Sequence, residues 1–311
     1  MDEKFQPLTF RLALLQARPR SWAAAVLPSL FGICYCKVMG YGLPWWKGIL
    51  LLAACVLFQS AVNSLNDYFD FVKGTDTEDD TLEADDAVLL YHHLNPESIK
   101  RLAIGFLAVG TVFGLICCIG AGWAPILIGL IGFITVILYS GGPLPISYLP
   151  IGELMSGLIM GGLIPLGIAA CADGRVHWDI LIYSIPLIIS IGLIMMSNNG
   201  CDIEKDIEAG RRTLPVLLKR PATLFLYRML LLLWNLLIVV LPIVALGPIG
   251  LVSTLLLVLL AGRKMISLAK LRLEPEGRIL QMKTIGMLNY IANAAYVTAF
   301  AVWILKEAFH G

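Results

Sequence analysis

The sequence predicts an all-α integral membrane protein with about nine transmembrane helices. Of its 311 residues, 58% are hydrophobic and only 14% are charged, which is too apolar for an ordinary soluble domain. The apolar residues form repeated runs of about 20 residues, the length that crosses a bilayer core. The basic residues collect between alternate runs, and the net charge of +1 gives no sign of nucleic-acid binding. These observations together favour a helical protein that crosses the membrane many times.

The chain alternates apolar runs with short polar segments after a polar start. Residues 1–20 mix basic and apolar residues, which favours a short interfacial helix, with a solvated leader as the alternative. The predicted spans lie at about residues 22–40, 46–66, 101–119, 122–140, 151–171, 178–198, 223–242, 244–262 and 284–305. Gly247 and Pro248 separate the seventh span from the eighth and predict a tight hairpin there. No soluble domain fits between the spans, so we expect residues 1–311 to form one domain.

The distribution of Lys and Arg predicts the orientation of the spans. With a cytoplasmic N-terminus, 19 of the 23 basic residues lie on the cytoplasmic side. The segments on that side are residues 1–21, 67–101, 140–150, 199–228 and 263–283. This excess is the positive-inside pattern of membrane proteins, so the C-terminus is expected outside. We expect the basic segment 263–283 to lie against anionic lipid head groups.

Two acidic motifs follow apolar runs, at the ends of the second and sixth predicted spans. Residues 63–76 read NSLNDYFDFVKGTD, and residues 198–213 read NNGCDIEKDIEAGRRT. Helical spacings of three and four residues place the polar side chains of each motif on roughly one side. Carboxylates at the end of a membrane helix are costly and typical of functional sites. Both motifs reach the predicted cytoplasmic face, and they suggest a shared site for hard cations.

The residue types in the motifs suit Mg²⁺ and a diphosphate. Mg²⁺ prefers oxygen ligands and commonly bridges carboxylates to phosphate groups. Nearby bases can bind the remaining phosphate charge, while amides orient waters or carboxylates around the metal. The candidate bases are Lys73, Lys205, Arg211 and Arg212, and the candidate amides are Asn63, Asn66, Asn198 and Asn199. The alternative is that these residues are helix caps and solvated loop charges, which fits one motif better than two matched ones.

The motifs resemble the two signatures of the UbiA superfamily of intramembrane prenyltransferases. The matching patterns are N-x-x-N-D-x-x-D followed by K-G-x-D, and N-N-x-x-D-x-x-x-D followed by R-R-T-L. Residues 139–153, YSGGPLPISYLPIGE, resemble the Y-x-G-G-P-x-P and G-E elements of the menaquinone branch. The resemblance extends over residues 9–305 in the number and order of spans. It implies helices around a central cavity open to lipid, with Mg²⁺ bound by Asp67, Asp70, Asp202 and Asp206.

The resemblance also implies a reaction. Enzymes of the menaquinone branch transfer a polyprenyl group from polyprenyl diphosphate to 1,4-dihydroxy-2-naphthoate, which loses its carboxylate as carbon dioxide. Metal ions stabilise the diphosphate as it leaves the allylic carbon, and apolar walls keep water away from the carbocation. We therefore expect a multi-pass enzyme of the plasma membrane that makes demethylmenaquinone, with an active site open toward the cytoplasm.

Three further residues are candidates for contact with the acceptor. Tyr139 and Tyr148 flank a Gly-Gly-Pro turn and could meet the cation or the acceptor ring, although aromatic residues are common at membrane interfaces in general. Glu153 begins a predicted span. It is either a helix N-terminal acid or a contact, or base, for the acceptor's hydroxyl group.

One segment departs from the family pattern. The loop after the first motif is commonly basic in the family, but residues 76–96 here contain seven acids and no Lys or Arg. Such a run is typical of a solvated loop, with a lid or a weak additional cation site as the alternative. Asp76 is the acid in this loop that is best placed for such a cation site.

Two other functions remain possible from the sequence. The first keeps the diphosphate chemistry but uses another acceptor, namely an aromatic acid, a porphyrin-type alcohol or a glycerol-phosphate lipid. The second is an ion-coupled transporter, because intramembrane acids often mark ion pathways, although transporters tend to place them near the bilayer midplane. The seven cysteines lie mostly in apolar runs without zinc spacing, which favours free, buried thiols.

Overall fold

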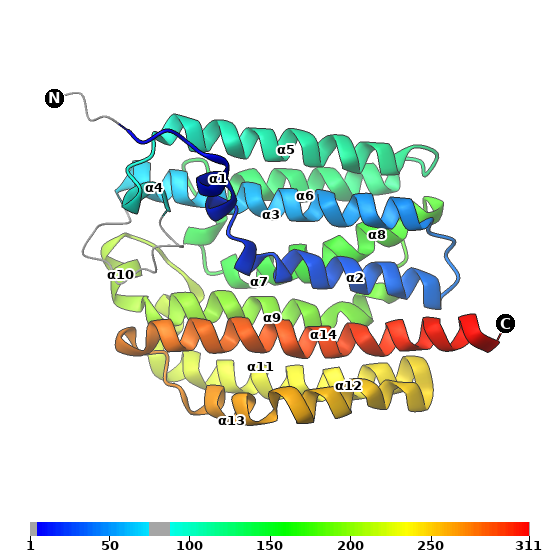
Figure 1. Ribbon diagram of the computed structural model, residues 1–311. Coiled ribbons are helices and arrows are strands. Elements are labelled where there is room, and N and C mark those ends of the chain that lie inside the picture. Colours follow the sequence, from blue (N-terminus) through cyan, green and yellow to red (C-terminus); the bar gives the residue numbers. More distant parts are fainter. Residues whose placement is uncertain (1–4, 75–87, 311) are drawn as a thin grey trace.

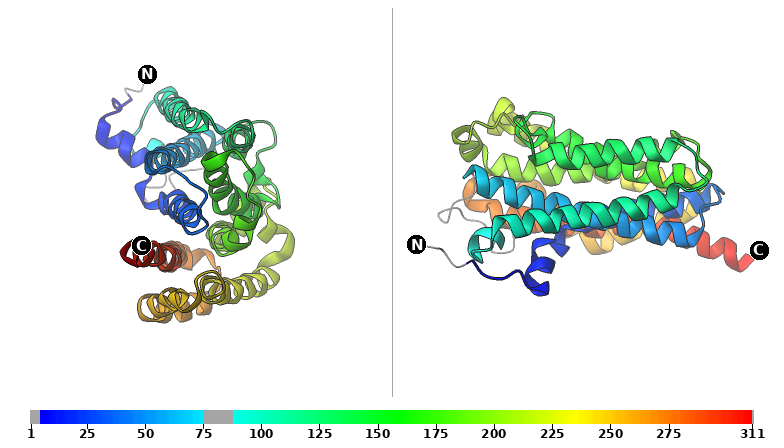
Figure 2. Two further views of the ribbon diagram at one scale, coloured as in Figure 1. Left: turned by 90° about the vertical axis from the view of Figure 1, so that its right-hand side faces the viewer. Right: turned by 90° about the horizontal axis from the view of Figure 1, so that it is seen from above.

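The structure is a computed structural model that describes residues 5–74 and 88–310. Its long helices run roughly parallel or antiparallel to one axis (Figures 1 and 2). They are α2 (Ala23–Val38), α3 (Trp45–Lys73), α5 (Pro96–Cys118), α6 (Ala124–Ser140), α9 (Asp179–Cys201), α11 (Leu214–Leu246) and α14 (Arg278–His310). Apolar side chains on the outside of these helices remain widely exposed, for example Leu232 and Val244. This surface fits a lipid environment and confirms the predicted helical membrane protein.

Two further segments are built from consecutive helical pieces. Residues 152–173 combine α7 (Gly152–Ser156), a π-helical stretch (Gly157–Leu163) and α8 (Ile164–Asp173). After α11, a short turn (Gly247–Gly250) leads to α12 (Leu251–Leu256), a second π-helical stretch (Leu257–Ala261) and α13 (Gly262–Lys270).

The chain reverses direction between α11 and α12. A Cβ at Gly250 would overlap the backbone of Pro242, so the chain returns directly onto α11, and α12 runs beside it (Figure 1). The predicted hairpin at Gly247 and Pro248 is therefore confirmed. All seven cysteines are free, also as expected.

The number of membrane crossings is not settled by helix length and composition alone. Within the described residues, six helical segments are long and apolar enough to span a membrane, or seven if the bent pair Phe10–Ser21 and Ala23–Val38 counts as one span. The difference from the expected nine has two sources. The helix α6 is only 17 residues long, and the residues Leu214–Lys270 count as one segment despite their reversal.

Two short helices lie beside the C-terminal end of α3. The helix α1 (Phe10–Gln16) is capped by Thr9, whose side chain accepts a hydrogen bond from the backbone N–H of Leu12. The helix α4 (Val88–Tyr91) buries Val88 and Leu89 against α1 and α3. The last part of the acidic loop is therefore packed rather than solvated. Asp76 and the other acids of this loop lie outside the described residues.

Small residues bring the 152–173 segment unusually close to α9. A Cβ at Gly157 or Gly161 would overlap the backbone of Ile188, so both positions need glycine at this contact. On the other side of α9, the helix α14 packs against α9, α2 and α12. Viewed along the bundle axis, the red α14 and the orange α12–α13 region lie at one end of the section and the cyan-green α5 at the other (Figure 2).

Candidate active site

A cavity of about 1270 Å³ lies among α2, α3, α5, α6, the 152–173 segment, α9 and α14. Its walls are largely apolar, with Phe58, Phe133 and Ile191 among the lining side chains. Its polar lining comes mainly from the two acidic motifs and their neighbours, at the end of the bundle where α4 and α10 lie (Figure 1). These residues are Arg18, Asn63, Asn66, Asp70, Asn198, Asn199, Asp202, Lys205, Asp206, Arg211 and Arg278. A cavity with one charged end and otherwise apolar walls suits a molecule with an ionic head and a hydrocarbon tail.

The first motif reaches the cavity through one face of the last turns of α3. Asn66 donates to the carboxylate of Asp70 through Nδ2, at 2.7 Å. The Ser140 hydroxyl, from the end of α6, donates to Oδ1 of Asn66 at 2.9 Å. The helix then ends at Gly74, which has the positive φ of +66° that favours glycine at a helix C-terminus. Asp70 is thus fixed at the cavity wall with its second oxygen turned toward the second motif.

Asp67 lies on α3 three residues before Asp70 but does not line the cavity. Its Oδ2 accepts a hydrogen bond from Nε2 of Gln16 at 2.7 Å and another from the backbone N–H of Leu89 at 3.1 Å. The guanidinium of Arg18 lies 3.7 Å from its other oxygen. These contacts tie α1 and α4 to α3 and favour a positioning role. Its assignment as a metal ligand stays a prediction that these contacts do not support.

The second motif is placed by a break between two helices. The helix α9 ends at Cys201, Asp202 takes a non-helical conformation, and α10 (Ile203–Glu208) starts in a new direction. Asp202 and Asp206 both reach the cavity. Thr213 donates to Oδ2 of Asp206 at 3.0 Å. Burial raises the pKa of Asp206 to about 6, although Arg211 and Thr213 act in the opposite direction.

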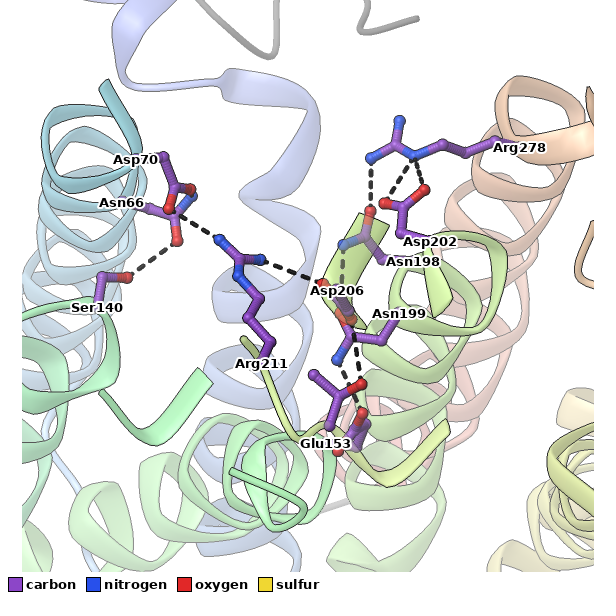
Figure 3. Close-up of polar contacts among 11 residues, drawn as sticks. Asn66, Asp70, Ser140, Glu153, Asn198, Asn199, Asp202, Asp206, Arg211 and Arg278 are labelled. Atoms are coloured by element: carbon purple, nitrogen blue, oxygen red, sulfur yellow. Dashed lines mark hydrogen bonds and ion pairs between the residues drawn. The ribbon is translucent and has the colours of Figure 1, made fainter. Parts of the chain in front are cut away.

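Arg211 joins the two motifs across the cavity (Figure 3). Its Nη2 lies 3.0 Å from Oδ1 of Asp70, and its Nη1 lies 3.6 Å from Oδ1 of Asp206. Burial by itself would lower the pKa of Arg211, but the two carboxylates raise it above the ordinary value. The guanidinium also lies over the ring of Tyr148, 4.7 Å from its centroid. The two motifs therefore meet at one cavity, and the shared cation site expected there stays a prediction.

Of the remaining candidate bases, one lines the cavity and two do not. Lys205 lines the cavity. Lys73 is exposed and does not line it, but its ammonium group lies 4.8 Å from the ring centroid of Tyr148 and donates to the backbone carbonyl of Ser140. Arg212 is also exposed, and its backbone N–H donates to the carbonyl of Tyr148. Lys73 and Arg212 thus lie beside Ser140 and Tyr148 rather than in the lining of the cavity.

The amides of the motifs divide between the cavity and the helix contacts. Asn63 lines the cavity and donates to the carbonyl of Ala17 and the hydroxyl of Ser21. Asn198 accepts a hydrogen bond from Arg278 at 2.7 Å. Asn199 donates to Oε1 of Glu153 at 2.7 Å. Asn198 and Asn199 therefore bind a cation and a carboxylate, whereas Asn63 joins α3 to residues 17–21. The expected role of these amides around a metal ion stays a prediction.

Glu153 and Tyr139 form a second polar group beside the motifs. Glu153 is 3% exposed, and its Oε2 has no hydrogen-bond partner in the described part of the chain. The hydroxyl of Tyr139 is also buried without a partner there, and Tyr139 lines the cavity. A buried polar atom without a partner costs free energy, so the Tyr139 hydroxyl suits a ligand that brings a polar atom to it. Glu153 does not line the cavity itself and lies behind Asn199, which does.

The polar end of the cavity has the donor chemistry for Mg²⁺ and a diphosphate. Asp70, Asp202 and Asp206 supply carboxylates, and Asn66 and Asn198 supply amide oxygens, which are ligand types that Mg²⁺ binds. Within residues 5–74 and 88–310, no three acidic, His or Cys side chains gather closely enough to form a metal cluster. Guanidinium groups hold the carboxylates instead.

Sequence reasoning missed Arg278. It belongs to the basic segment expected to lie against lipid head groups, yet its side chain lines the cavity and binds Asp202. A clue was available, because Arg278 is at the start of the last span and therefore on the same side of the membrane as both motifs. The contact could not be predicted from local spacing, because Arg278 and Asp202 are 76 residues apart in the chain.

Comparisons with known proteins agree with this arrangement. Residues 25–284 match the model of the UbiA prenyltransferase family, and the chain belongs to this family of enzymes. A 1,4-dihydroxy-2-naphthoate octaprenyltransferase of Bacillus subtilis is 31% identical, over 65% of this chain and 64% of that protein. A Mycobacterium tuberculosis protein of the same name is 32% identical, over 69% of this chain and 72% of that one. The alignment thus spans slightly less than two thirds of the Bacillus protein.

The fold is shared with solved structures of the family. A UbiA homolog from Archaeoglobus fulgidus bound to DMAPP and Mg²⁺ has a TM-score of 0.59 against this protein. The comparison covers 93% of this chain and 99% of that one, at 17% sequence identity. Family membership favours an enzyme over the transporter alternative.

Proposed function

We propose that this protein is an Mg²⁺-dependent polyprenyltransferase that transfers the prenyl group of a polyprenyl diphosphate to 1,4-dihydroxy-2-naphthoate. Decarboxylation accompanies the transfer, and the product is the hydroquinone form of demethylmenaquinone. The names of the Bacillus and Mycobacterium relatives support this acceptor, and the Archaeoglobus structure with DMAPP and Mg²⁺ supports the donor and the metal.

The contact of Arg211 with both motifs is the observation that carries the proposal. One guanidinium reaches Asp70 and Asp206, so the two motifs are close enough to act on one small ionic group. The apolar part of the same cavity continues from this point. A diphosphate would lie between the motifs, and its prenyl chain would extend along the apolar walls.

Different residues of the cavity would bind the metal ions, bind the phosphate oxygens and exclude water. Asp70, Asp202 and Asp206, with Asn66 and Asn198, would hold the metal ions, which supply positive charge for the diphosphate as it leaves. Arg211 and Lys205 would bind phosphate oxygens that the metals leave free. Side chains such as Phe58 and Phe133 exclude water from the allylic carbon, and this protects the electron-deficient centre from hydrolysis.

We infer that Glu153 acts on the acceptor, and its contact with the cavity-lining residue Asn199 supports this inference. The hydrogen bond from Asn199 fixes one oxygen of its carboxylate and leaves Oε2 without a partner. We assign Oε2 to the acceptor's hydroxyl group, whose proton it would accept as the ring attacks the allylic carbon. The new carbon–carbon bond forms at the ring carbon that carries the carboxylate, and that carboxylate leaves as carbon dioxide. The electron pair of the broken bond returns to the ring, and the ring oxygen regains the proton from Glu153, so the product is a hydroquinone. The Tyr139 hydroxyl would donate to an acceptor oxygen.

We also infer nine spans with a cytoplasmic N-terminus. Residues Leu214–Lys270 reverse at Gly247–Gly250 and therefore supply two crossings. The helix α6, at 17 residues, is about 26 Å long and close to the thickness of a bilayer core. The helix α1 and the end of α14 lie at opposite ends of the bundle (Figure 1), which fits an odd number of crossings. The end of the bundle that holds the candidate site, where most Lys and Arg residues lie, would face the cytoplasm. The protein would be a plasma-membrane protein with one domain.

An assay with purified protein tests the proposal directly. The protein in detergent is incubated with Mg²⁺, a polyprenyl diphosphate and 1,4-dihydroxy-2-naphthoate carrying a labelled carboxylate. Prenylated product together with labelled carbon dioxide is the expected result, and Asp70→Asn should abolish both. If diphosphate binds in an Mg²⁺-dependent way but no naphthoate product forms, the acceptor assignment is wrong, and other aromatic or lipid acceptors take its place.

A further inference from the structure

Two arginines, rather than one, hold the carboxylates of the candidate site. Arg211 contacts Asp70 and Asp206, and Arg278 contacts Asp202 (Figure 3). The two arginines come from different parts of the chain, the loop after α10 and the start of α14. The three aspartates that line the cavity within the described residues are therefore each paired with a guanidinium.

The contacts of Arg278 are short and directed. Its Nε lies 2.9 Å from Oδ1 and 3.0 Å from Oδ2 of Asp202, and its Nη2 donates to Oδ1 of Asn198 at 2.7 Å. The side chains of Arg278 and Asp202 are 14% and 17% exposed. Arg278 therefore engages the carboxylate and the amide oxygen that a cation at the second motif would use.

A guanidinium and a hard cation compete for the same oxygens. A carboxylate that neutralises Arg278 from 2.9 Å cannot also face a metal ion without moving that positive charge aside. A displaced guanidinium at the edge of a partly buried cavity needs another anion, because an unpaired buried charge is costly. A diphosphate offers such an anion, and its oxygens match the fork of N–H donors of arginine.

We propose that Arg278 is a diphosphate-binding residue, and that Arg211 and Arg278 exchange their aspartates for diphosphate oxygens when Mg²⁺ enters. This assignment rests on the proposed function, because it requires a prenyl diphosphate at the site. Without substrate, the arginines form ion pairs with the aspartates of the two acidic motifs. They become ligands of the substrate once the carboxylates turn to the metal.

The exchange has a thermodynamic consequence. Mg²⁺ alone must compete with two ion pairs and leaves the arginines without anions, so it binds weakly. The oxygens of a diphosphate that binds together with Mg²⁺ accept hydrogen bonds from both guanidinium groups. The free-energy cost of leaving these charges unpaired is then removed. The affinities of the two ligands are therefore positively coupled, and each tightens the binding of the other by the same factor.

Substitution of Arg278 separates this role from a merely structural one. In Arg278→Gln, Mg²⁺ alone should bind at least about fivefold more tightly, because its competitor at Asp202 is gone. Geranyl diphosphate in the presence of Mg²⁺ should bind at least about tenfold more weakly, because a charge-assisted hydrogen bond to the substrate is lost. A purely structural role of Arg278 predicts that both affinities fall together.

Arg220→Gln is the matched control. Arg220 makes an equally short pair of contacts with the carboxylate of Glu204, at 2.7 and 2.8 Å, but it does not line the cavity. Its loss should leave both affinities within about twofold of wild type. Arg278→Lys keeps the charge but not the fork of donors, and it should recover part of the diphosphate affinity.

Both affinities can be measured by titration calorimetry on purified protein in detergent, with MgCl₂ alone and with geranyl diphosphate in excess MgCl₂. Opposite shifts in Arg278→Gln, with Arg220→Gln unchanged, establish the exchange. Parallel shifts, or no shift, overturn it while wild-type binding keeps the proposed function intact. A wild-type protein without Mg²⁺-dependent diphosphate binding overturns both. If Arg278→Gln does not fold, wild-type diphosphate affinity in Arg278→Lys also refutes the assignment.

Discussion

Asp67 and Asp70 are three residues apart in one motif, yet the structure predicts opposite consequences for their substitution. The carboxylate of Asp67 is 2% exposed and is turned to Gln16 and Leu89, whereas Asp70 lines the cavity. Asp67→Ala should therefore destabilise the fold while leaving the diphosphate site able to bind. Asp70→Ala should remove Mg²⁺-dependent binding.

The magnitude of the Asp67 effect follows from the donors that lose their acceptor. The amide of Gln16 and the backbone N–H of Leu89 would both remain buried without a partner in Asp67→Ala. Each unsatisfied buried donor costs about 1–3 kcal/mol, so the two together predict a loss of about 2–6 kcal/mol. The guanidinium of Arg18, 3.7 Å from the carboxylate, adds to this loss.

Thermal unfolding in detergent, with and without Mg²⁺ plus geranyl diphosphate, measures both effects. Wild type should gain stability from the ligands, because ligands that bind the folded state raise its melting temperature. Asp67→Ala should unfold at a lower temperature but keep the ligand-dependent increase, while Asp70→Ala should lose that increase. An Asp67→Ala protein with wild-type stability and no response to the ligands would refute this reasoning and restore Asp67 as a metal ligand.

Three further predictions concern the acceptor, the metal and the packing. Glu153→Gln should lower kcat by at least about 100-fold, as loss of a general base does, while the Kd for geranyl diphosphate stays unchanged; equal loss of both would assign Glu153 to the fold instead. Because burial raises the pKa of Asp206 to about 6 and a metal needs the charged carboxylate, protons compete below that pH. The affinity for Mg²⁺ should then fall about tenfold from pH 7 to pH 5 in titration calorimetry, and a constant affinity would contradict the placement of Asp206. Gly161→Ala should destabilise the protein by about 1–3 kcal/mol or more, measured by thermal unfolding, because its Cβ would overlap Ile188, whereas Gly129→Ala, which has open space around its Cβ, should not.

Local sequence patterns predicted much of the fold because the bilayer restricts the possible structures. A chain in lipid must satisfy its backbone hydrogen bonds within each segment, so apolar runs of sufficient length become helices. The helix break at Gly247 and Pro248 was also predictable, since these residues favour a turn wherever they occur. The number of crossings was less certain, because a 17-residue helix such as α6 is near the limit of what spans a membrane.

The site was predictable in its chemistry but not in its contacts. Residue types and spacing within each motif predicted a cation and diphosphate site at Asp67, Asp70, Asp202 and Asp206. The direction of each side chain depends on how the helices pack. Spacing alone grouped Asp67 with Asp70, whereas in the structure α1 and α4 bind Asp67 and the cavity takes only Asp70.

The sequence by itself determined the helical membrane class, the two acidic motifs and their common side of the membrane. These properties depend on composition and on residues close together in the chain. Only the tertiary structure decided that Arg211 lies between the motifs, that Arg278 binds Asp202 and that Glu153 keeps one carboxylate oxygen without a protein partner. Arg278 and Asp202 are separated by 76 residues. Their contact forms only when two distant helices pack together, so a local sequence pattern cannot predict it.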